Sequence, residues 1–152
     1  MKTILTALAF AALAMPAGDP AGFHLWSASE LKGFSKSLAP KMDAGKVATE
    51  QLGGHGNYTF MVAHREGPGQ AEWHETQADV FFVQSGNATL VYGGKMDGKT
   101  TAPHEQRAAS ITGGMEKKLG PGDVVTIPAK TPHQLKLDAG KEFTYFVVKI
   151  KQ

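Results

Sequence analysis

From Val47 to the C-terminus, short apolar stretches alternate with turn residues, which is the pattern of β-strands. The stretches are rich in Val, Ile, Phe, Tyr and Thr, and Gly, Pro, Asn or Asp separate them. Strands are expected at residues 58–65, 79–84, 88–92, 123–127, 133–137 and 143–150. Strands of this length and spacing predict an all-β fold, with a single antiparallel β-barrel as the architecture.

One helix is expected before the strands. Ser27 and Glu30 have the Ser-x-x-Glu spacing of a capping box, and apolar residues from Leu31 to Leu38 recur at helical intervals until Pro40. This segment predicts one short amphipathic helix packed on the outside of the domain.

Residues 1–17 have the features of a signal peptide. Lys2 supplies a positive charge, residues 4–13 are apolar, and residues 12–14 offer a small-x-small cleavage pattern, so cleavage is expected near 14–17. The apolar stretch is too short to span a bilayer, so no stable membrane span is expected. The pattern predicts a periplasmic or secreted protein, with a linker and short helix at 18–45 and a barrel domain at 46–152.

The composition of the chain limits which partners and which metal ligands are possible. The 152 residues leave room for one domain, and 16 Lys and Arg against 14 Asp and Glu give a net charge of +2. The longest basic run is Lys117-Lys118, so no nucleic-acid partner is expected. Because the chain has no Cys, any metal must be bound by His and carboxylate side chains.

Four such side chains fall on predicted strands. Glu72 and His74 are two residues apart and share a face, while Asp79 and His133 each begin a row of apolar residues. Two imidazoles beside carboxylates inside a barrel outline a metal site. Other interpretations remain open: the histidines are core residues bonded to backbone, Asp79 bonds nearby amides, and Glu72 is an exposed rim acid.

Two segments carry a family resemblance. The first cupin motif reads His-x-His, three or four residues, Glu, six residues, Gly. The segment from Glu72 to Gly86 resembles it, with Glu72-Trp73-His74, then four residues, Asp79, six residues and Gly86. Residues 122–133 resemble the second motif, with a Gly-Asp opening, an Ile-Pro pair and a His five residues after that Pro.

The resemblance implies a single jelly-roll (cupin) β-barrel with one pocket and a bound divalent metal. His74, Asp79 and His133 match the motif ligands, and Glu72 stands where the first His would be. The set of two His and two carboxylates favours Mn or Fe, with Zn, Ni and Cu also open. Cupin barrels pair through outer strands, so a homodimer is a further expectation.

Two functions follow. The first is a metal-dependent enzyme, a dioxygenase, isomerase or lyase, acting on a small molecule, with Glu72 or His64 moving a proton. The alternative is a non-catalytic barrel that binds a small molecule or a metal, and for His64 a structural role also remains open. Residues 93–122 are longer than a hairpin needs and are expected either as a surface excursion or as a lid.

Overall fold

The computed structural model describes residues 18–152, and the predicted signal peptide at 1–17 lies outside them. An extended segment leads into helix α1 (Ala28–Leu38) and a short 3-10 helix, η1 (Ala39–Lys41). The predicted capping box is confirmed. Ser27 Oγ accepts a hydrogen bond from the Glu30 N–H at 3.2 Å, and the Glu30 carboxylate accepts one from the Ser27 N–H at 2.7 Å.

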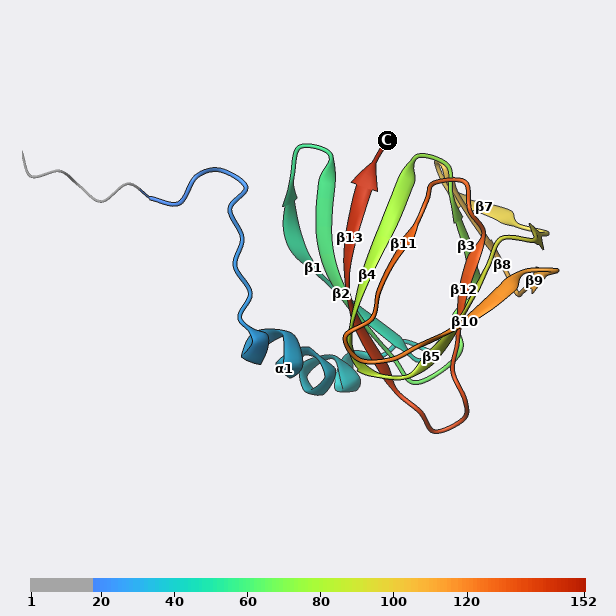
Figure 1. The fold of residues 1–152 in the computed structure, drawn as a ribbon, viewed down its shortest axis with the longest axis horizontal. Helices are drawn as coiled ribbons and strands as arrows, with labels where there is room; N and C mark the ends of the chain where they lie inside the picture. Colours follow the sequence, from blue (N-terminus) through green and yellow to red (C-terminus); the bar gives the residue numbers. More distant parts are fainter. Residues whose placement is uncertain (1–17) are drawn as a thin grey trace, which may run out of the picture.

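The strands form two antiparallel sheets that face each other (Figure 1). The first has the order β1-β2-β13-β4-β11, and its strands are β1 (Val47–His55), β2 (Tyr58–Arg65), β4 (Gln77–Gly86), β11 (Val124–Ile127) and β13 (Phe143–Lys151). The second has the order β10-β5-β12-β3-β8-β7, and its strands are β3 (Ala71–His74), β5 (Ala88–Tyr92), β7 (Lys99–Ala102), β8 (Glu105–Ala108), β10 (Met115–Leu119) and β12 (His133–Lys136). A small ribbon pairs β6 (Lys95–Met96) with β9 (Ile111–Thr112). The all-β jelly-roll prediction with one short helix is confirmed.

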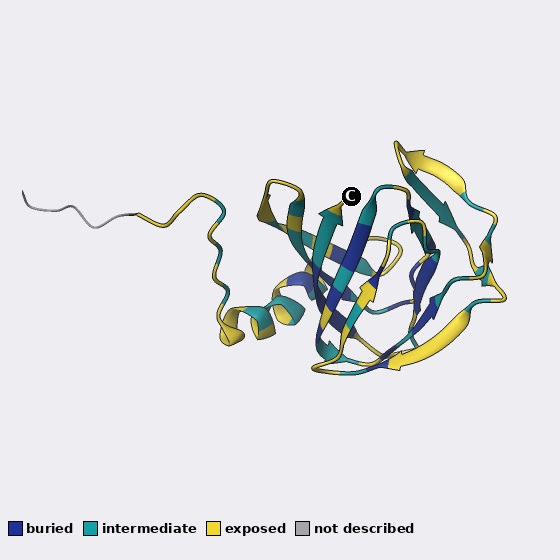
Figure 2. Ribbon diagram, turned by 45° about the horizontal axis from the view of Figure 1, so that its top comes forward, coloured by how far each residue is buried: buried dark blue, intermediate teal, exposed yellow. Residues whose placement is uncertain are grey.

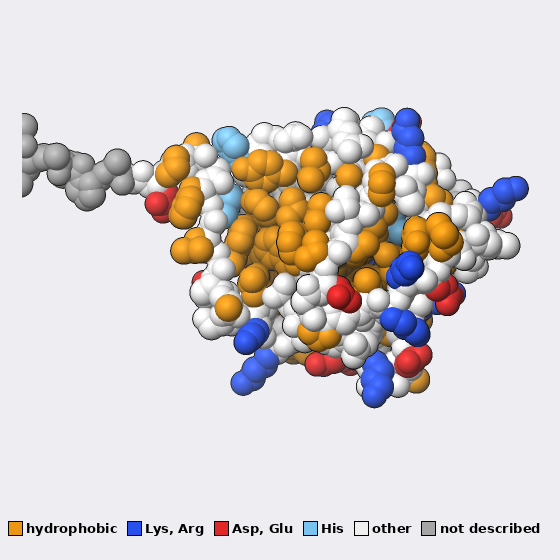
Figure 3. All heavy atoms as spheres, viewed as in Figure 1, with side chains coloured by type: hydrophobic (Ala, Val, Ile, Leu, Met, Phe, Trp, Pro, Cys, Tyr) orange, Lys and Arg blue, Asp and Glu red, His pale blue; other side chains and the backbone are white. Residues whose placement is uncertain are grey.

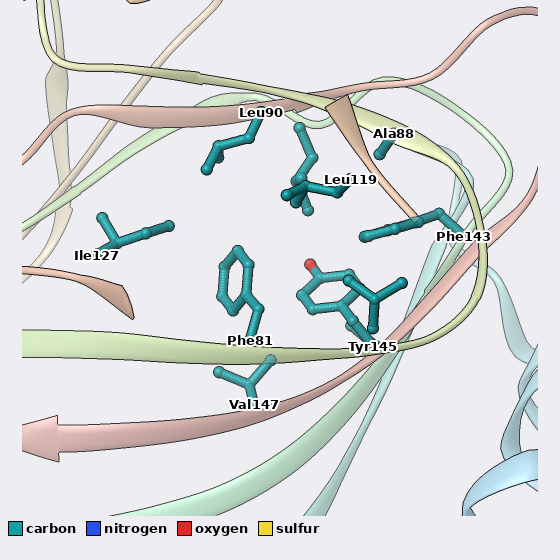
Figure 4. Packing of buried hydrophobic residues seen from close by; sticks show 11 residues of the cluster. Phe81, Ala88, Leu90, Leu119, Ile127, Phe143, Tyr145 and Val147 are labelled. Atoms are coloured by element: carbon teal, nitrogen blue, oxygen red, sulfur yellow. The ribbon is translucent and has the colours of Figure 1, made fainter. Parts of the chain in front are cut away.

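The inward-facing side chains of the two sheets meet in one apolar core (Figure 4). The ring centroids of Phe81 on β4 and Tyr145 on β13 are 4.8 Å apart, and Phe143 lies 5.1 Å from Tyr145. Leu90 reaches the same cluster from the second sheet. Because strand residues two apart share a face, the buried row that contains Phe81 also directs Asp79 inward, as its alternation predicts.

Helix α1 packs against the outer face of the first sheet. Leu38 is fully buried there, against Val62 of β2 and Ala48 of β1. The helix therefore contributes its own small core on the outside of the barrel, as its apolar spacing predicts.

Further along this outer face, apolar side chains gather over β2, β13 and β4 (Figure 3). The ring of Trp26, from the segment before α1, lies 5.0 Å from that of Phe60 and 5.2 Å from that of Phe146. Phe82 and Val124 remain 37% and 58% exposed. The N-terminal segment thus covers only part of an apolar sheet face.

Residues 93–122, expected as a surface excursion or a lid, contribute three strands to the second sheet and also form the β6–β9 ribbon. Strands β7 and β8 add to one edge, and β10 pairs with β5 at the other. Figure 2 shows β7 and most of β10 exposed, whereas β8 is half-buried. No helix among residues 18–152 is long and apolar enough to cross a membrane.

Candidate metal centre

Two neighbouring strands bring three of the predicted ligands together. Glu72 and His74 lie on β3, and His133 begins β12 directly opposite Glu72. One ligand atom from each of the three lies within 4.8 Å of the others. Both imidazoles are buried, and Glu72 is half-buried. The strand alternation that placed Glu72 and His74 on one face is therefore confirmed.

The imidazole of His74 is oriented by Glu105. The two residues are cross-strand partners on β3 and β8, and Nδ1 of His74 donates to Oε2 of Glu105. A proton held on Nδ1 leaves the lone pair of Nε2 directed into the barrel, which is the arrangement that carboxylates impose on metal-binding histidines. Burial by itself would lower the pKa of His74, but its contacts with Asp79 and Glu105 outweigh that effect and raise it.

The imidazole of His133 is oriented by its own turn. Nδ1 lies 3.0 Å from the carbonyl oxygen of Thr131, which can only accept, so Nδ1 carries the proton. Nε2 is buried and has no hydrogen-bond partner among the described residues. A buried nitrogen lone pair without a partner costs free energy. This atom, aimed at the other two ligands, makes the group fit a divalent metal ion.

Glu72 is held by two guanidinium groups. Arg107, its cross-strand partner on β8, donates to Oε1 at 2.6 Å, and Arg65 lies 3.7 Å from the same oxygen. Burial by itself would raise the pKa of Glu72, but the charges of Arg107 and Arg65 lower it. The carboxylate is therefore ionised at neutral pH, and its other oxygen, Oε2, lies 3.7 Å from Nε2 of His74.

Asp79, the fourth predicted ligand, is paired with a lysine. The Lys149 ammonium lies 2.9 Å and 3.1 Å from the two carboxylate oxygens of Asp79 and 3.2 Å from Nε2 of His74. Asp79 Oδ2 also lies 3.3 Å from His74 Nε2 and 3.6 Å from His133 Nε2. Burial by itself would raise the pKa of Asp79, but the two imidazoles and Lys149 hold it well below its usual range.

A cavity of about 860 Å³ opens onto these groups. Glu72, His74, Asp79 and Lys149 line it together with polar and apolar side chains from both sheets. Arg65 also lines it, fixed by a hydrogen bond of 2.9 Å from Nε to the hydroxyl of Tyr145. The volume is that of a small-molecule binding site, and the charged groups lie along its wall.

His64, expected as a proton carrier in the pocket, is not brought to it. On β2, Met61, Ala63 and Arg65 line the cavity, so His64 lies on the outer face with Val62. Its Nδ1 lies 2.8 Å from Oγ1 of Thr144. His64 therefore lies away from the cavity, and we assign this residue no part in the barrel site.

Sequence reasoning missed four charged residues of the site: Arg65, Glu105, Arg107 and Lys149. A signal existed for Lys149, because it ends the inward row that begins at Phe143 and runs through every second residue of β13. Glu105 and Arg107 lie in the segment between the motifs, where no periodicity marked them. They reach the site because β8 pairs with β3.

The fold and the site define a small double-stranded β-helix barrel with His and carboxylate side chains that could hold a metal ion. No protein-family model and no curated protein sequence matches the chain. Solved structures do match. An uncharacterised protein with a double-stranded β-helix domain from Klebsiella pneumoniae aligns with 16% identity and a TM-score of 0.57, over 85% of this chain and 90% of its own.

Two further structures have the same barrel. A cupin 2 conserved barrel domain protein from Rhodopseudomonas palustris aligns with 17% identity and a TM-score of 0.50, over 68% of this chain and 60% of its own. The polyketide cyclase RemF from Streptomyces resistomycificus also has 17% identity and a TM-score of 0.50, over 70% of this chain and 66% of its own. The chain thus spans less than two thirds of either protein. The likeness shows that the chain has the double-stranded β-helix fold of cupin barrels, which is the fold that its two motifs predict.

Proposed function

We propose that the protein is a divalent-metal-dependent enzyme that acts on a small polar molecule in the barrel cavity. The observation that supports this most directly is the convergence of Glu72, His74 and His133, with ligand atoms within 4.8 Å of one another. Each imidazole is bonded through Nδ1, so each Nε2 faces the other ligands. Two His and one carboxylate suit Fe²⁺ or Mn²⁺ and leave coordination positions open for a substrate.

The residues around this centre suit catalysis better than simple storage of a metal. A bound metal would polarise a substrate oxygen or bind dioxygen. Lys149 places an ammonium 3.2 Å from Nε2 of His74, where it can donate a proton to an oxygen of a bound substrate. Arg107 keeps Glu72 ionised and oriented. An open centre beside a proton donor is compatible with dioxygenase, isomerase and lyase chemistry.

The substrate that this cavity fits carries hydroxyl, carbonyl or carboxylate groups. Arg65, Arg107 and Lys149 supply donors along the wall, and Glu72 and Glu105 supply acceptors. A purely apolar ligand would displace water from these charged groups without replacing its hydrogen bonds, which is unfavourable. The likeness in fold to a polyketide cyclase supports a small organic substrate without identifying it.

A non-catalytic barrel is the second candidate, and one observation favours it. Arg107 already neutralises Glu72, and Lys149 already neutralises Asp79, so the pocket is electrostatically balanced by its own side chains. Such a barrel would bind a polar ligand without chemistry.

Measurements of metal content and of turnover distinguish the metal-dependent enzyme from the non-catalytic barrel. Protein purified without an affinity tag or chelator is compared with a His74→Ala/His133→Ala variant and with a matched His55→Ala/His104→Ala variant, whose histidines are exposed. We expect near-stoichiometric metal in the parent and the control and almost none in the first variant. The loaded protein is then incubated with hydroxy acids, keto acids and catechols, followed by NMR and by a dioxygen electrode.

Each outcome has a clear meaning. Product formation that needs the metal supports the enzyme, and dioxygen uptake selects the dioxygenase class over isomerase and lyase. Metal with no turnover of any compound favours the binding barrel. A parent protein that takes up no Mn²⁺ or Fe²⁺ would contradict the proposed enzyme.

Two further proposals concern the setting of the protein. We propose that it is exported, and N-terminal sequencing of the mature protein should begin after residues 14–17. We also propose a homodimer through the outer face of the first sheet, where Phe82 and Val124 are exposed. Sedimentation at high micromolar concentration should give a dimer, and Val124→Asp should give a monomer.

A further inference from the structure

A second group of potential metal ligands lies outside the barrel site. His64 is near the end of β2, Glu66 follows that strand, and Glu142 precedes β13. One ligand atom from each lies within 4.8 Å of the others, and Nε2 of His64 is 3.7 Å from Oε1 of Glu66. His64 is fully buried, Glu66 is partly exposed, and Glu142 is exposed. The group is thus open to solvent on its carboxylate side.

The pairing of β2 with β13 explains why the two carboxylates meet. Arg65 is the register partner of Phe143, so Glu66 and Glu142 are the next residues outward on the two chains. Like charges placed opposite each other across antiparallel chains are destabilising. Neither carboxylate contacts a Lys or Arg within the described part of the chain. A bound cation would remove this repulsion.

His64 supplies the second, independent observation. Its Nδ1 lies 2.8 Å from Oγ1 of Thr144, whereas its Nε2 is buried and has no hydrogen-bond partner among residues 18–152. The hydroxyl oxygen of Thr144 can accept from Nδ1–H, and in that tautomer the Nε2 lone pair is directed toward the two carboxylates. A histidine bonded through one nitrogen and free at the other is the usual state of a metal ligand.

We propose that His64, Glu66 and Glu142 form a second cation site, on the outside of the barrel, for a divalent ion that accepts nitrogen ligands, with Zn²⁺ as the best fit. One imidazole and two carboxylates provide three ligands, and water completes a tetrahedral set. Mg²⁺ and Ca²⁺ are disfavoured because they select all-oxygen sites. The bound ion would join the end of β2 to the turn before β13 and stabilise that end of the sheet.

This site is separate from the proposed metal centre in the barrel. Thr144 contacts His64 of the outer site, and Lys149 contacts the ligands of the barrel site. The two residues are five positions apart on β13, which is about 17 Å along a strand. His64 also lies on the opposite face of the sheet from the cavity-lining Ala63 and Arg65. The second site can therefore be tested independently of the first, and of any enzyme activity.

Zinc stoichiometry tests the proposal. Titration calorimetry with Zn²⁺ and metal analysis after dialysis are carried out on the parent, on Glu66→Gln/Glu142→Gln, and on the matched control Glu50→Gln/Glu116→Gln. We expect the Glu66 and Glu142 variant to bind one equivalent less than the parent, and the control to bind as many as the parent. Because the exchanged carboxylates are exposed or partly exposed, we expect all of these variants to fold.

The barrel variant His74→Ala/His133→Ala isolates the outer site. It should still bind one Zn²⁺, with a rise in Tm on zinc addition, and adding Glu66→Gln/Glu142→Gln should abolish both. Equal zinc stoichiometry in the parent and the Glu66→Gln/Glu142→Gln variant would overturn the proposal. That comparison remains decisive if the barrel variant does not fold.

Discussion

Lys149 and Asp79 are cross-strand partners on β13 and β4, and their side chains form an ion pair inside the mouth of the barrel. The Lys149 ammonium contacts both oxygens of Asp79 and also lies 3.2 Å from His74 Nε2. The protein therefore carries its own cation beside the group of metal-ligand side chains. Asp79 neutralises the charge of Lys149. The Asp79 carboxylate is therefore available to a metal only if Lys149 moves away.

The first prediction follows from that pair. Lys149→Met should bind Mn²⁺ or Fe²⁺ at least about tenfold more tightly, because a positive charge beside the ligands is removed and Asp79 is released. The metal-free variant should be less stable by about 3 kcal/mol, because Asp79 is left buried without its partner. Calorimetry and urea unfolding measure the two effects. The exposed Lys151→Met is the control, and equal metal affinity in the variant and the parent would contradict the prediction.

The second prediction concerns the carboxylate behind His74. Glu105→Gln keeps the shape of the side chain but removes the charge that holds the proton on Nδ1, so metal affinity should fall about 10- to 100-fold. Metal titration measures this. Glu75→Gln is a matched control, because Glu75 bonds the exposed His104 through the same atoms at 2.6 Å. If both variants lose affinity equally, the role of Glu105 in orienting His74 is wrong.

The third prediction concerns acid stability. The pKa values of Glu72 and Asp79 are lowered in the folded protein, so their ionisation stabilises the fold above their unfolded pKa values of about 4. This stabilisation should be lost progressively as the pH falls below about 5. Urea unfolding at pH 7, 5, 4 and 3 should show the decline.

The variant Arg107→Gln tests whether the lowered pKa of Glu72 causes this loss of stability in acid. Without that guanidinium, the folded-state pKa of Glu72 moves back toward its ordinary value, so the variant should lose less of its remaining stability between pH 5 and pH 3. Lys117→Gln changes an exposed residue that does not line the barrel cavity, and it should follow the parent. An Arg107→Gln curve parallel to the parent would show that Glu72 is not the group responsible.

The fourth prediction concerns the helix. Leu38→Ala should lower the free energy of unfolding by about 3 kcal/mol, because it empties the small core between α1, Val62 and Ala48. Leu25→Ala should change it by less than about 0.5 kcal/mol, because Leu25 is 77% exposed. Equal effects of the two changes would mean that α1 does not stabilise the barrel.

The strands and the spacing of the ligands could be read from the chain itself. Alternation placed Glu72 with His74 and Asp79 with Phe81, because a strand turns successive side chains to opposite faces. The same rule left the position of His64 undecided. Alternation shows that His64 and Val62 share a face, but it does not say which face of a strand is covered by another sheet.

The sequence by itself determined the all-β class, the capped helix and four of the residues that meet in the barrel: Glu72, His74, Asp79 and His133. Only the tertiary structure brought in Glu105 and Arg107, through the pairing of β8 with β3, and placed Lys149 against Asp79. The physical reason is that local periodicity depends on a residue's immediate neighbours in the chain. Which charge meets which ligand depends instead on strand register, and register is decided when distant strands pair and bury their apolar faces together.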